Sequence, residues 1–264
     1  MPFHQTDSIR YYTFDSLEDA GVTHAVFTRR GGLSPDPWSS LNVGGLLGDD
    51  PDRVYQNRVL SFQSMGLAPE SVYDAWQVHG DEVICTDKAR PPSQPHRKAD
   101  AILTSSPEVT LFMRFADCVP VVLYDPVKKV IGLVHAGWKG TMKGAVTRAL
   151  ETMKLEFSSQ PQDIQAALGP SIGPHHYEIG DDIADQVTRT FGQDAGELLP
   201  KTNGSVHFDL WTANQLLLDR AGVRRIEVSG LCTACHLEDW YSHRGEKGKT
   251  GRFGVLISLK SKRD

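Results

Sequence analysis

The 264-residue sequence has few cysteines, no long apolar run and little excess of charge of either sign. Four cysteines in a chain of this length are too few for the disulfide framework that staples small secreted domains. The longest apolar stretches, such as Val119–Tyr124, are far shorter than the roughly 20 residues of a membrane-spanning helix. A net charge of −5 gives no reason to expect nucleic acid or a membrane surface as a partner.

The first residues, MPFHQTDSIRYYTF, contain neither the basic nor the apolar region of a secretory signal. We therefore expect a cytoplasmic protein whose cysteines remain thiols. The sequence also lacks repeats and low-complexity blocks, and its one proline-rich stretch, Pro91–Pro95, is too short for a domain linker. With 39% apolar residues, residues 1–264 are expected to form a single domain with a short flexible tail at about 260–264.

Short β-rich runs alternate along the chain with amphipathic helical patterns. The expected strands are Ala25–Thr28, Val83–Thr86, Val109–Phe115, Val119–Tyr124, Lys129–Val134, Arg225–Val228 and Gly254–Leu259. The expected helices are Asp52–Met65, Thr141–Lys154, Asp181–Phe191 and Leu210–Ala221, the last with Asp209 as its N-cap and Gly222 as its stop. A turn at Asp125–Lys128 predicts a hairpin. Hairpins mixed with helices indicate an α+β fold with mixed β-sheets.

Three metal-competent side chains stand where predicted strands end or turn. They are His79, Cys118 and His135. Strand ends can converge at one edge of a sheet, and two imidazoles with a thiolate suit Zn²⁺ with a fourth position open for water or substrate. The residues are far apart in the sequence, however, so their spacing leaves a second interpretation open: a buried thiol and two hydrogen-bonded histidines with no metal.

Two glycine-rich loops add candidate ligand-binding residues. The segment His135–Thr141 connects a strand to a helix, and its glycines and Lys139 could admit an anion. In the second loop, Gly169–His176, small residues including Ser171 could form a pocket wall, and His175 could act in acid–base chemistry. An ordinary tight connection is the alternative for the first loop, and adjacent histidines usually point apart.

The segment Cys232–His236 contains a CxxCH pattern. A c-type haem attachment site would require export, which the N-terminus does not support. A zinc knuckle would need a second pair of cysteines, and only the distant Cys85 and Cys118 remain. The sequence therefore favours packed thiols over a thioredoxin-like redox pair or a metal site.

Seven short motifs, in order along most of the chain, resemble the YfiH/laccase-domain family. They are Thr28–Ser34, Ser40–Gly44, Gln77–Gly80, Ala116–Pro120, His135–Gly140, Gly169–Pro174 and Lys249–Arg252. This resemblance implies a layered α/β/β/α fold and one zinc ion held by the residues that match the family's ligands, His79, Cys118 and His135. These three residues would also form the catalytic centre.

The resemblance also implies a range of activities. Members were first classed as multicopper polyphenol oxidases, and others cleave purine nucleosides with phosphate to a free base and ribose 1-phosphate or deaminate adenosine. An editing role toward peptidoglycan precursors has also been suggested. A copper oxidase needs several metals and clustered histidines, whereas the ten histidines here are mostly isolated, so one zinc fits better than copper.

We therefore expect a zinc-dependent purine nucleoside phosphorylase, with adenosine deamination as a further activity of the same open zinc site. Its candidate substrate or phosphate ligands are Arg29, Asn42, Lys139, Ser171, His175 and Arg244. Many relatives carry cysteines where this chain has His175 and His176, so these histidines could change specificity or add a metal ligand. The alternatives are a copper-dependent laccase, a peptidoglycan-precursor editing enzyme and a non-catalytic thiol-redox protein built on Cys232 and Cys235.

Overall fold

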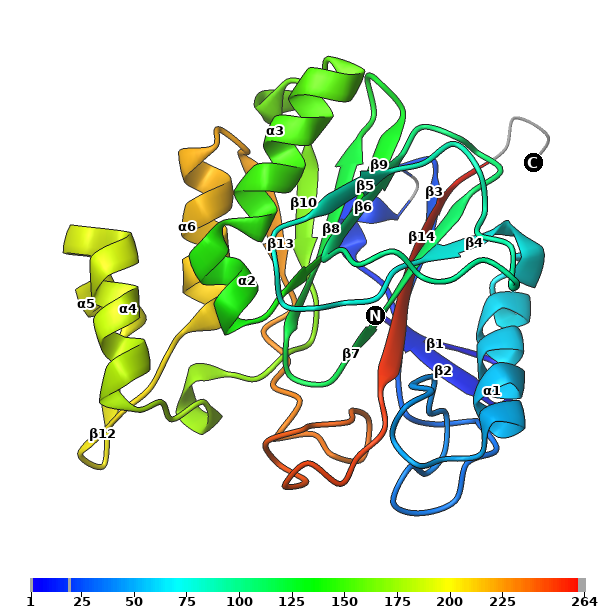
Figure 1. The fold of residues 1–264 in the computed structure, drawn as a ribbon, viewed down its shortest axis with the longest axis horizontal. Coiled ribbons are helices and arrows are strands. Elements are labelled where there is room, and N and C mark those ends of the chain that lie inside the picture. Colours follow the sequence, from blue (N-terminus) through cyan, green and yellow to red (C-terminus); the bar gives the residue numbers. More distant parts are fainter. Residues whose placement is uncertain (1, 19, 261–264) are drawn as a thin grey trace.

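Two six-stranded mixed β-sheets pack face to face at the centre of the molecule (Figure 1). The computed structural model describes residues 2–18 and 20–260. In spatial order, the first sheet contains β1 (Phe3–Thr6), β2 (Ile9–Tyr12), β3 (Val22–Phe27), β14 (Phe253–Leu259), β7 (Thr110–Phe115) and β4 (Val72–Asp74). The second contains β13 (Arg225–Val228), β10 (Gln165–Leu168), β8 (Val119–Asp125), β9 (Val130–Ala136), β6 (Ala101–Thr104) and β5 (Val83–Cys85).

Helices cover the outer face of each sheet. The first sheet is covered by α1 (Pro51–Ser64), and the second by α2 (Trp138–Lys143), α3 (Ala145–Phe157) and α6 (Leu210–Arg220), with α4 (Asp181–Phe191) and α5 (Ala195–Leu198) beyond them (Figure 1). The remaining elements are the ribbon of β11 (Lys201–Thr202) and β12 (Ser205–Val206) and the 3₁₀ turns η1 (Asp15–Leu17), η2 (Pro69–Ser71), η3 (Pro161–Asp163), η4 (Pro174–His176) and η5 (Gly192–Asp194). The expected α/β/β/α layering is confirmed. Within the described ranges, no helix is both long and apolar enough to cross a bilayer.

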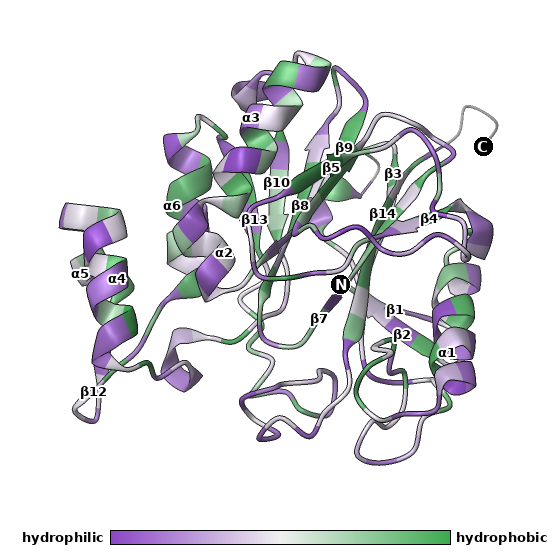
Figure 2. Ribbon diagram, viewed as in Figure 1, coloured by the Kyte–Doolittle hydropathy of each residue, from purple (hydrophilic) through white to green (hydrophobic). Residues whose placement is uncertain are grey.

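The central strands are buried on both faces. Every residue of β8, β9 and β14 is buried, and apolar residues gather on these strands while polar ones lie on the outward turns of the helices (Figure 2). Alternate side chains of β8, such as Val122 and Tyr124, enter the core between the sheets, and those between them, such as Val121 and Leu123, pack under the helices. Helices on the outer faces thus explain why these strands read as continuous apolar runs.

Several sequence predictions are confirmed. β8 and β9 form the expected hairpin, and Asp125 Oδ1 accepts hydrogen bonds from the amides of Val127 (2.8 Å) and Lys128 (2.9 Å) in its turn. Asp209 caps α6 by accepting a hydrogen bond from the amide of Thr212 at 3.0 Å. α1 and α4 also begin and end within a residue of their predicted bounds.

Other predictions were wrong or incomplete. The single helix predicted over Thr141–Lys154 is divided into α2 and α3 at Gly144, whose φ of +80° breaks the helical path. The short strands β1, β2, β4, β6, β11 and β12 were not predicted, because each has too few residues for a clear alternating pattern. Residues 261–264 of the expected tail lie outside the described part of the chain.

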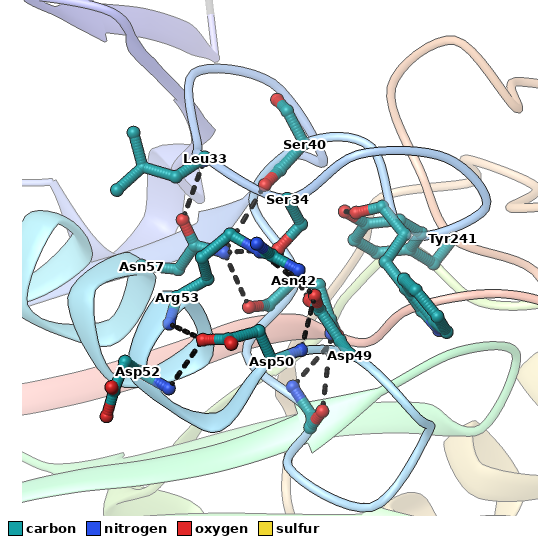
Figure 3. A network of polar contacts seen from close by, with 12 residues as sticks. Leu33, Ser34, Ser40, Asn42, Asp49, Asp50, Asp52, Arg53, Asn57 and Tyr241 are labelled. Carbon is teal, nitrogen blue, oxygen red and sulfur yellow. Dashed lines mark hydrogen bonds and ion pairs between the residues drawn. The ribbon is translucent and has the colours of Figure 1, made fainter.

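A buried polar network fastens the long segment between β3 and α1 to that helix (Figure 3). Asn57 of α1 donates hydrogen bonds to Ser34 Oγ at 2.9 Å and to the carbonyl of Asn42 at 2.8 Å, and its Oδ1 accepts one from the amide of Leu33 at 2.9 Å. Asn42 in turn donates to Asp49 Oδ2 at 2.9 Å. Both asparagines are fully buried, so these hydrogen bonds satisfy amide groups that water cannot reach.

Asn57→Ala leaves several of these buried polar groups without partners. We expect it to lower the free energy of unfolding by about 3 kcal/mol, since each unpaired buried group costs about 1–3 kcal/mol. Urea denaturation monitored by tryptophan fluorescence measures the change. The matched control is Gln56→Ala, on the exposed face of the same helix. Equal stabilities for the two variants would show that the network contributes nothing.

Candidate metal centre

The three predicted metal ligands come together at one end of β8 and β9, the central strands of the second sheet. They are His79, Cys118 and His135. Cys118 directly precedes β8, and His135 lies near the end of β9, where it pairs with Pro120 of β8. His79 comes from the segment between β4 and β5. One donor atom from each residue lies within 4.8 Å of the other two, and the two imidazole centroids are 4.9 Å apart. These three residues, which we call the metal triad, therefore form one potential metal site.

Asp100, which directly precedes β6, organises the triad. Its carboxylate accepts hydrogen bonds from the amides of Val78 (3.1 Å), His79 (3.0 Å) and Gly80 (2.7 Å). It also bonds His135 Nδ1 at 2.8 Å, which leaves Nε2 of that imidazole available as a metal ligand. This carboxylate–histidine pair is the usual outer partner of a metal-binding histidine. Asp100 thereby positions both histidines of the triad.

The triad also favours the ionised form of its thiol. Burial raises the pKa of Cys118, but the facing imidazoles of His135 and His79 outweigh it and lower that pKa to about 6. Burial likewise lowers the pKa of His135, and the Cys118 thiolate together with Asp100 raises it to about 9. Thiolate is the form of cysteine that binds metals, and a metal bound at the triad would displace the proton that the raised pKa keeps on His135.

Close packing and a strained backbone hold the triad in place. A Cβ atom at Gly137 would lie 2.7 Å from Cys118 Sγ and 3.2 Å from His79 Cδ2, so only glycine fits there. His79 has a left-handed backbone with φ of +58°, and so does Asp117 with φ of +86°. Non-glycine residues rarely adopt this conformation, although aspartate and histidine do so more often than most. The hydrogen bond from the amide of His79 to Asp100 helps to hold His79 in it.

Asp117, the residue before Cys118, makes its side-chain hydrogen bonds outside the triad. Its carboxylate accepts hydrogen bonds from Thr233 Oγ1 at 2.7 Å, Ser242 Oγ at 2.6 Å and the amide of Arg244 at 2.6 Å. It therefore joins the start of β8 to the loop that follows β13. The orienting role belongs to Asp100, which the sequence analysis missed because no local pattern sets it apart.

Two of the predicted substrate ligands, Arg29 and Asn42, form hydrogen bonds or ion pairs with other residues of the protein. Arg29 donates hydrogen bonds to the carbonyls of Ser39 (2.7 Å) and Leu237 (2.9 Å) and pairs with Glu246 at 2.9 Å, beside a hollow of about 310 Å³. Asn42 is fully buried in the network of Figure 3. These contacts stabilise the scaffold, and substrate binding by either residue stays a prediction.

Three other candidates lie on segments next to the triad. Lys139 is exposed near the start of α2, with its Nζ 5.4 Å from the centroid of the Trp138 ring. Arg244 is exposed and lies over the ring of Tyr177, 5.1 Å from its centroid. Ser171 is fully buried, and its Oγ accepts a hydrogen bond from Trp211 Nε1 at 2.6 Å. Lys139 and Arg244 are therefore the two exposed cations in this group.

Arg252 is a further cation beside the triad that the sequence analysis did not select. Burial lowers its pKa, while the nearby Cys118 and Asp117 act in the opposite direction. Its amide donates to Asn42 Oδ1 at 2.9 Å, which ties it to the network around α1. The signal was present, since Arg252 ends the motif Lys249–Arg252.

The sixth candidate, His175, is not part of the triad. Its Nε2 lies 3.1 Å from Cys235 Sγ, in a separate group of side chains. A cavity of about 590 Å³ also lies elsewhere, between α1 and residues 90–96, where Asp74 pairs with Arg90 (2.8 Å) and His96 (2.9 Å). None of the residues that line this cavity belongs to the triad, so the cavity and the candidate metal centre are separate features.

Asp100→Asn removes the negative charge but keeps the size of the side chain. We expect metal affinity to fall by about 10- to 100-fold, because the amide keeps only one acceptor oxygen and its NH₂ group must then face either His135 or the backbone N–H groups that Asp100 accepts from. Competition with a chromophoric chelator measures this affinity. Asp185→Asn, on the exposed surface of α4, controls for the change in net charge. Unchanged affinity in Asp100→Asn would contradict the organising role of this carboxylate.

Gly137→Ala places a methyl group against the thiol of the triad. The required shift of Cys118 or His79 is expected to weaken metal binding by about tenfold or more, as changes around a metal site commonly do. Gly196→Ala is the control, since a Cβ atom there meets no neighbour within 4 Å. If the two variants bind metal equally well in the chelator assay, the close packing at Gly137 is not required.

Comparison with known proteins agrees with this architecture. A family model described as multi-copper polyphenol oxidoreductase laccase matches residues 23–260. A purine nucleoside phosphorylase of Deinococcus radiodurans is 40% identical over 238 residues, covering 90% of this chain and 89% of that protein. The purine nucleoside phosphorylase YlmD of Bacillus subtilis is 35% identical over 242 residues, covering 88% and 87%.

Solved structures show the same fold. YlmD from Geobacillus stearothermophilus superposes with a TM-score of 0.91 at 30% identity, covering 98% of this chain and 99% of that one. The YfiH protein of Bacillus licheniformis gives a TM-score of 0.89 at 33% identity, with the same coverage. The match extends over nearly the whole chain in both sequence and structure, so this protein belongs to the laccase-like family of YfiH and YlmD.

Proposed function

We propose that this protein is a zinc-dependent purine nucleoside phosphorylase that converts adenosine or inosine and phosphate to the free base and ribose 1-phosphate. The observation that carries the proposal is the metal triad, in which a thiolate and two imidazoles converge beside Asp100. The names of the relatives from Deinococcus radiodurans and Bacillus subtilis support the reaction class.

The donor set of the triad fits zinc. Two nitrogens and one sulfur are ligands that Zn²⁺ prefers, and three protein ligands leave a position open, as in catalytic zinc sites. A zinc ion bound there would act as a Lewis acid and lower the pKa of a bound water to about 7. The same property supports adenosine deamination as a second activity of this site.

The residues around the triad match the needs of phosphorolysis. In this reaction a phosphate oxygen bonds to C1′ of the ribose while the bond from C1′ to the base breaks, and the base leaves with the electron pair of that bond and takes up the proton that the hydrogen phosphate loses. Lys139, Arg244 and Arg252 supply positive charge for the phosphate from segments that adjoin the triad. Asp100 holds His135 in a single tautomer, and Cys118 remains ionised, so the metal ligands need no rearrangement before the reaction.

The decisive experiment combines metal analysis with turnover of adenosine and inosine, with and without phosphate. We expect wild-type protein to contain zinc and release base only with phosphate. Cys118→Ala is expected to lose the zinc of the triad and at least about 100-fold of the activity, since metal catalysis contributes several kcal/mol. Cys85→Ala, which removes an exposed thiol outside the triad, is the control.

Other outcomes would change the assignment. Conversion of adenosine to inosine without phosphate would make deamination the main reaction. Zinc without any nucleoside turnover would exclude the nucleoside substrate and direct the search to peptidoglycan precursors. Copper with oxygen uptake on phenols would replace both the proposed metal and the proposed reaction.

A further inference from the structure

A second group of metal-competent side chains lies outside the triad. His175 and His176 of η4 meet Cys232 and Cys235 of the segment after β13, and one donor atom from each lies within 4.8 Å of the other three. His175 Nε2 and Cys235 Sγ are 3.1 Å apart. In the described part of the chain, this group and the triad are the two such clusters of histidine, cysteine and acidic side chains.

Backbone pairing brings the two segments together. β10 and β13 run parallel, and just beyond them Ser171 and Cys232 form an isolated bridge. The amide of Ser171 donates to the carbonyl of Leu231 at 3.1 Å, and the amide of Thr233 donates to the carbonyl of Ser171 at 3.0 Å. The cysteine pair is thereby fixed beside the loop that leads into η4.

Local turns then direct the four side chains toward one another. The 3₁₀ turn η4 places the rings of His175 and His176 at 61° with centroids 4.9 Å apart, so these adjacent side chains do not diverge as expected. The amide of Cys235 donates to the carbonyl of Cys232 at 3.2 Å, which closes a tight turn between the thiols. The amide of Gly173 donates to Cys232 Sγ at 3.2 Å and would stabilise negative charge on that sulfur.

We propose that His175, His176, Cys232 and Cys235 form a second zinc site, structural in type and separate from the triad. Two thiolates and two imidazoles are a complete tetrahedral ligand set, which leaves no position open for substrate. Binding of Zn²⁺ would release the two thiol protons to solvent. The second pair of ligands for Cys232 and Cys235 is therefore the two histidines, whereas the sequence offered only distant cysteines for this role.

The second site is linked to the triad through Asp117. Thr233, beside Cys232, donates to Asp117 Oδ1 at 2.7 Å, and the amide of Ile172 donates to the carbonyl of Asp117 at 2.9 Å. Both segments that carry the second site therefore contact the residue before Cys118. A zinc ion that joins these segments would also steady the thiol of the triad.

Zinc content of variants, measured by mass spectrometry after removal of loosely bound metal, tests this proposal. We expect about two zinc ions per wild-type chain, about one in Cys235→Ser, about one in Cys118→Ala and none in the double variant. Cys85→Ser should retain about two. Substitution with Co²⁺ adds a second measurement, since thiolate-to-cobalt absorption should be stronger in Cys118→Ala, which keeps two thiolates, than in Cys235→Ser, which keeps one at the triad.

The zinc counts do not depend on nucleoside turnover, so failure of the proposed function and failure of this proposal are distinguishable. If Cys235→Ser does not fold, His176→Asn removes one ligand while keeping both cysteines. The proposal is overturned if zinc content is the same in wild type and in the variant of the second site. It is also overturned if unreduced wild type contains a Cys232–Cys235 disulfide and about one zinc, which would indicate a redox pair.

Discussion

The candidate metal centre depends on a carboxylate that, among residues 2–18 and 20–260, has no lysine or arginine among its hydrogen-bond partners. Asp100 is fully buried, and burial of an ionised group is costly unless hydrogen bonds replace its water. Three backbone amides and the His135 imidazole supply those bonds, so the same contacts that stabilise the charge also shape the site. The local fold and the donor geometry therefore depend on each other, because displacement of either histidine would remove one of the four hydrogen bonds of this carboxylate.

The sheets explain why this arrangement is rigid. β9 lies between β8 and β6, so His135 has Cys118 at the start of one neighbouring strand and Asp100 at the start of the other. β8 and β9 are paired with each other along their whole length and every residue in them is buried, which fixes the positions of Cys118 and His135. His79 comes from a loop, and its left-handed backbone is held through Asp100. Residues on strands or directly before them thus set the geometry of the site, and the backbone of His79 is held in position by its hydrogen bond to Asp100.

The sequence allowed the metal donors to be predicted because imidazole and thiol side chains stood at ends of clear apolar runs. It did not identify Asp100, one of 33 acidic residues, because its importance arises from contacts with strands and loops distant in the chain. Nor did the sequence reveal the partner of Arg29, which pairs with Glu246 more than 200 residues away, whereas the substrate or phosphate contact expected of Arg29 stays a prediction. The group of His175 and Cys235 likewise follows from the pairing of β10 with β13, which no local pattern encodes.

The two groups of donors differ in ways that suit different tasks. In the triad, Cys118 is half-buried and His135 buried, while His79 is exposed. His79 is therefore the member of the triad that is open to solvent, and the side chains of Lys139 and Arg244 are exposed as well. The second group has four donors from a 3₁₀ turn and a tight turn, so a bound metal would join two segments rather than meet a substrate. Asp117 contacts both of these segments and directly precedes Cys118. A metal in the four-donor group can therefore steady the triad without taking part in the chemistry.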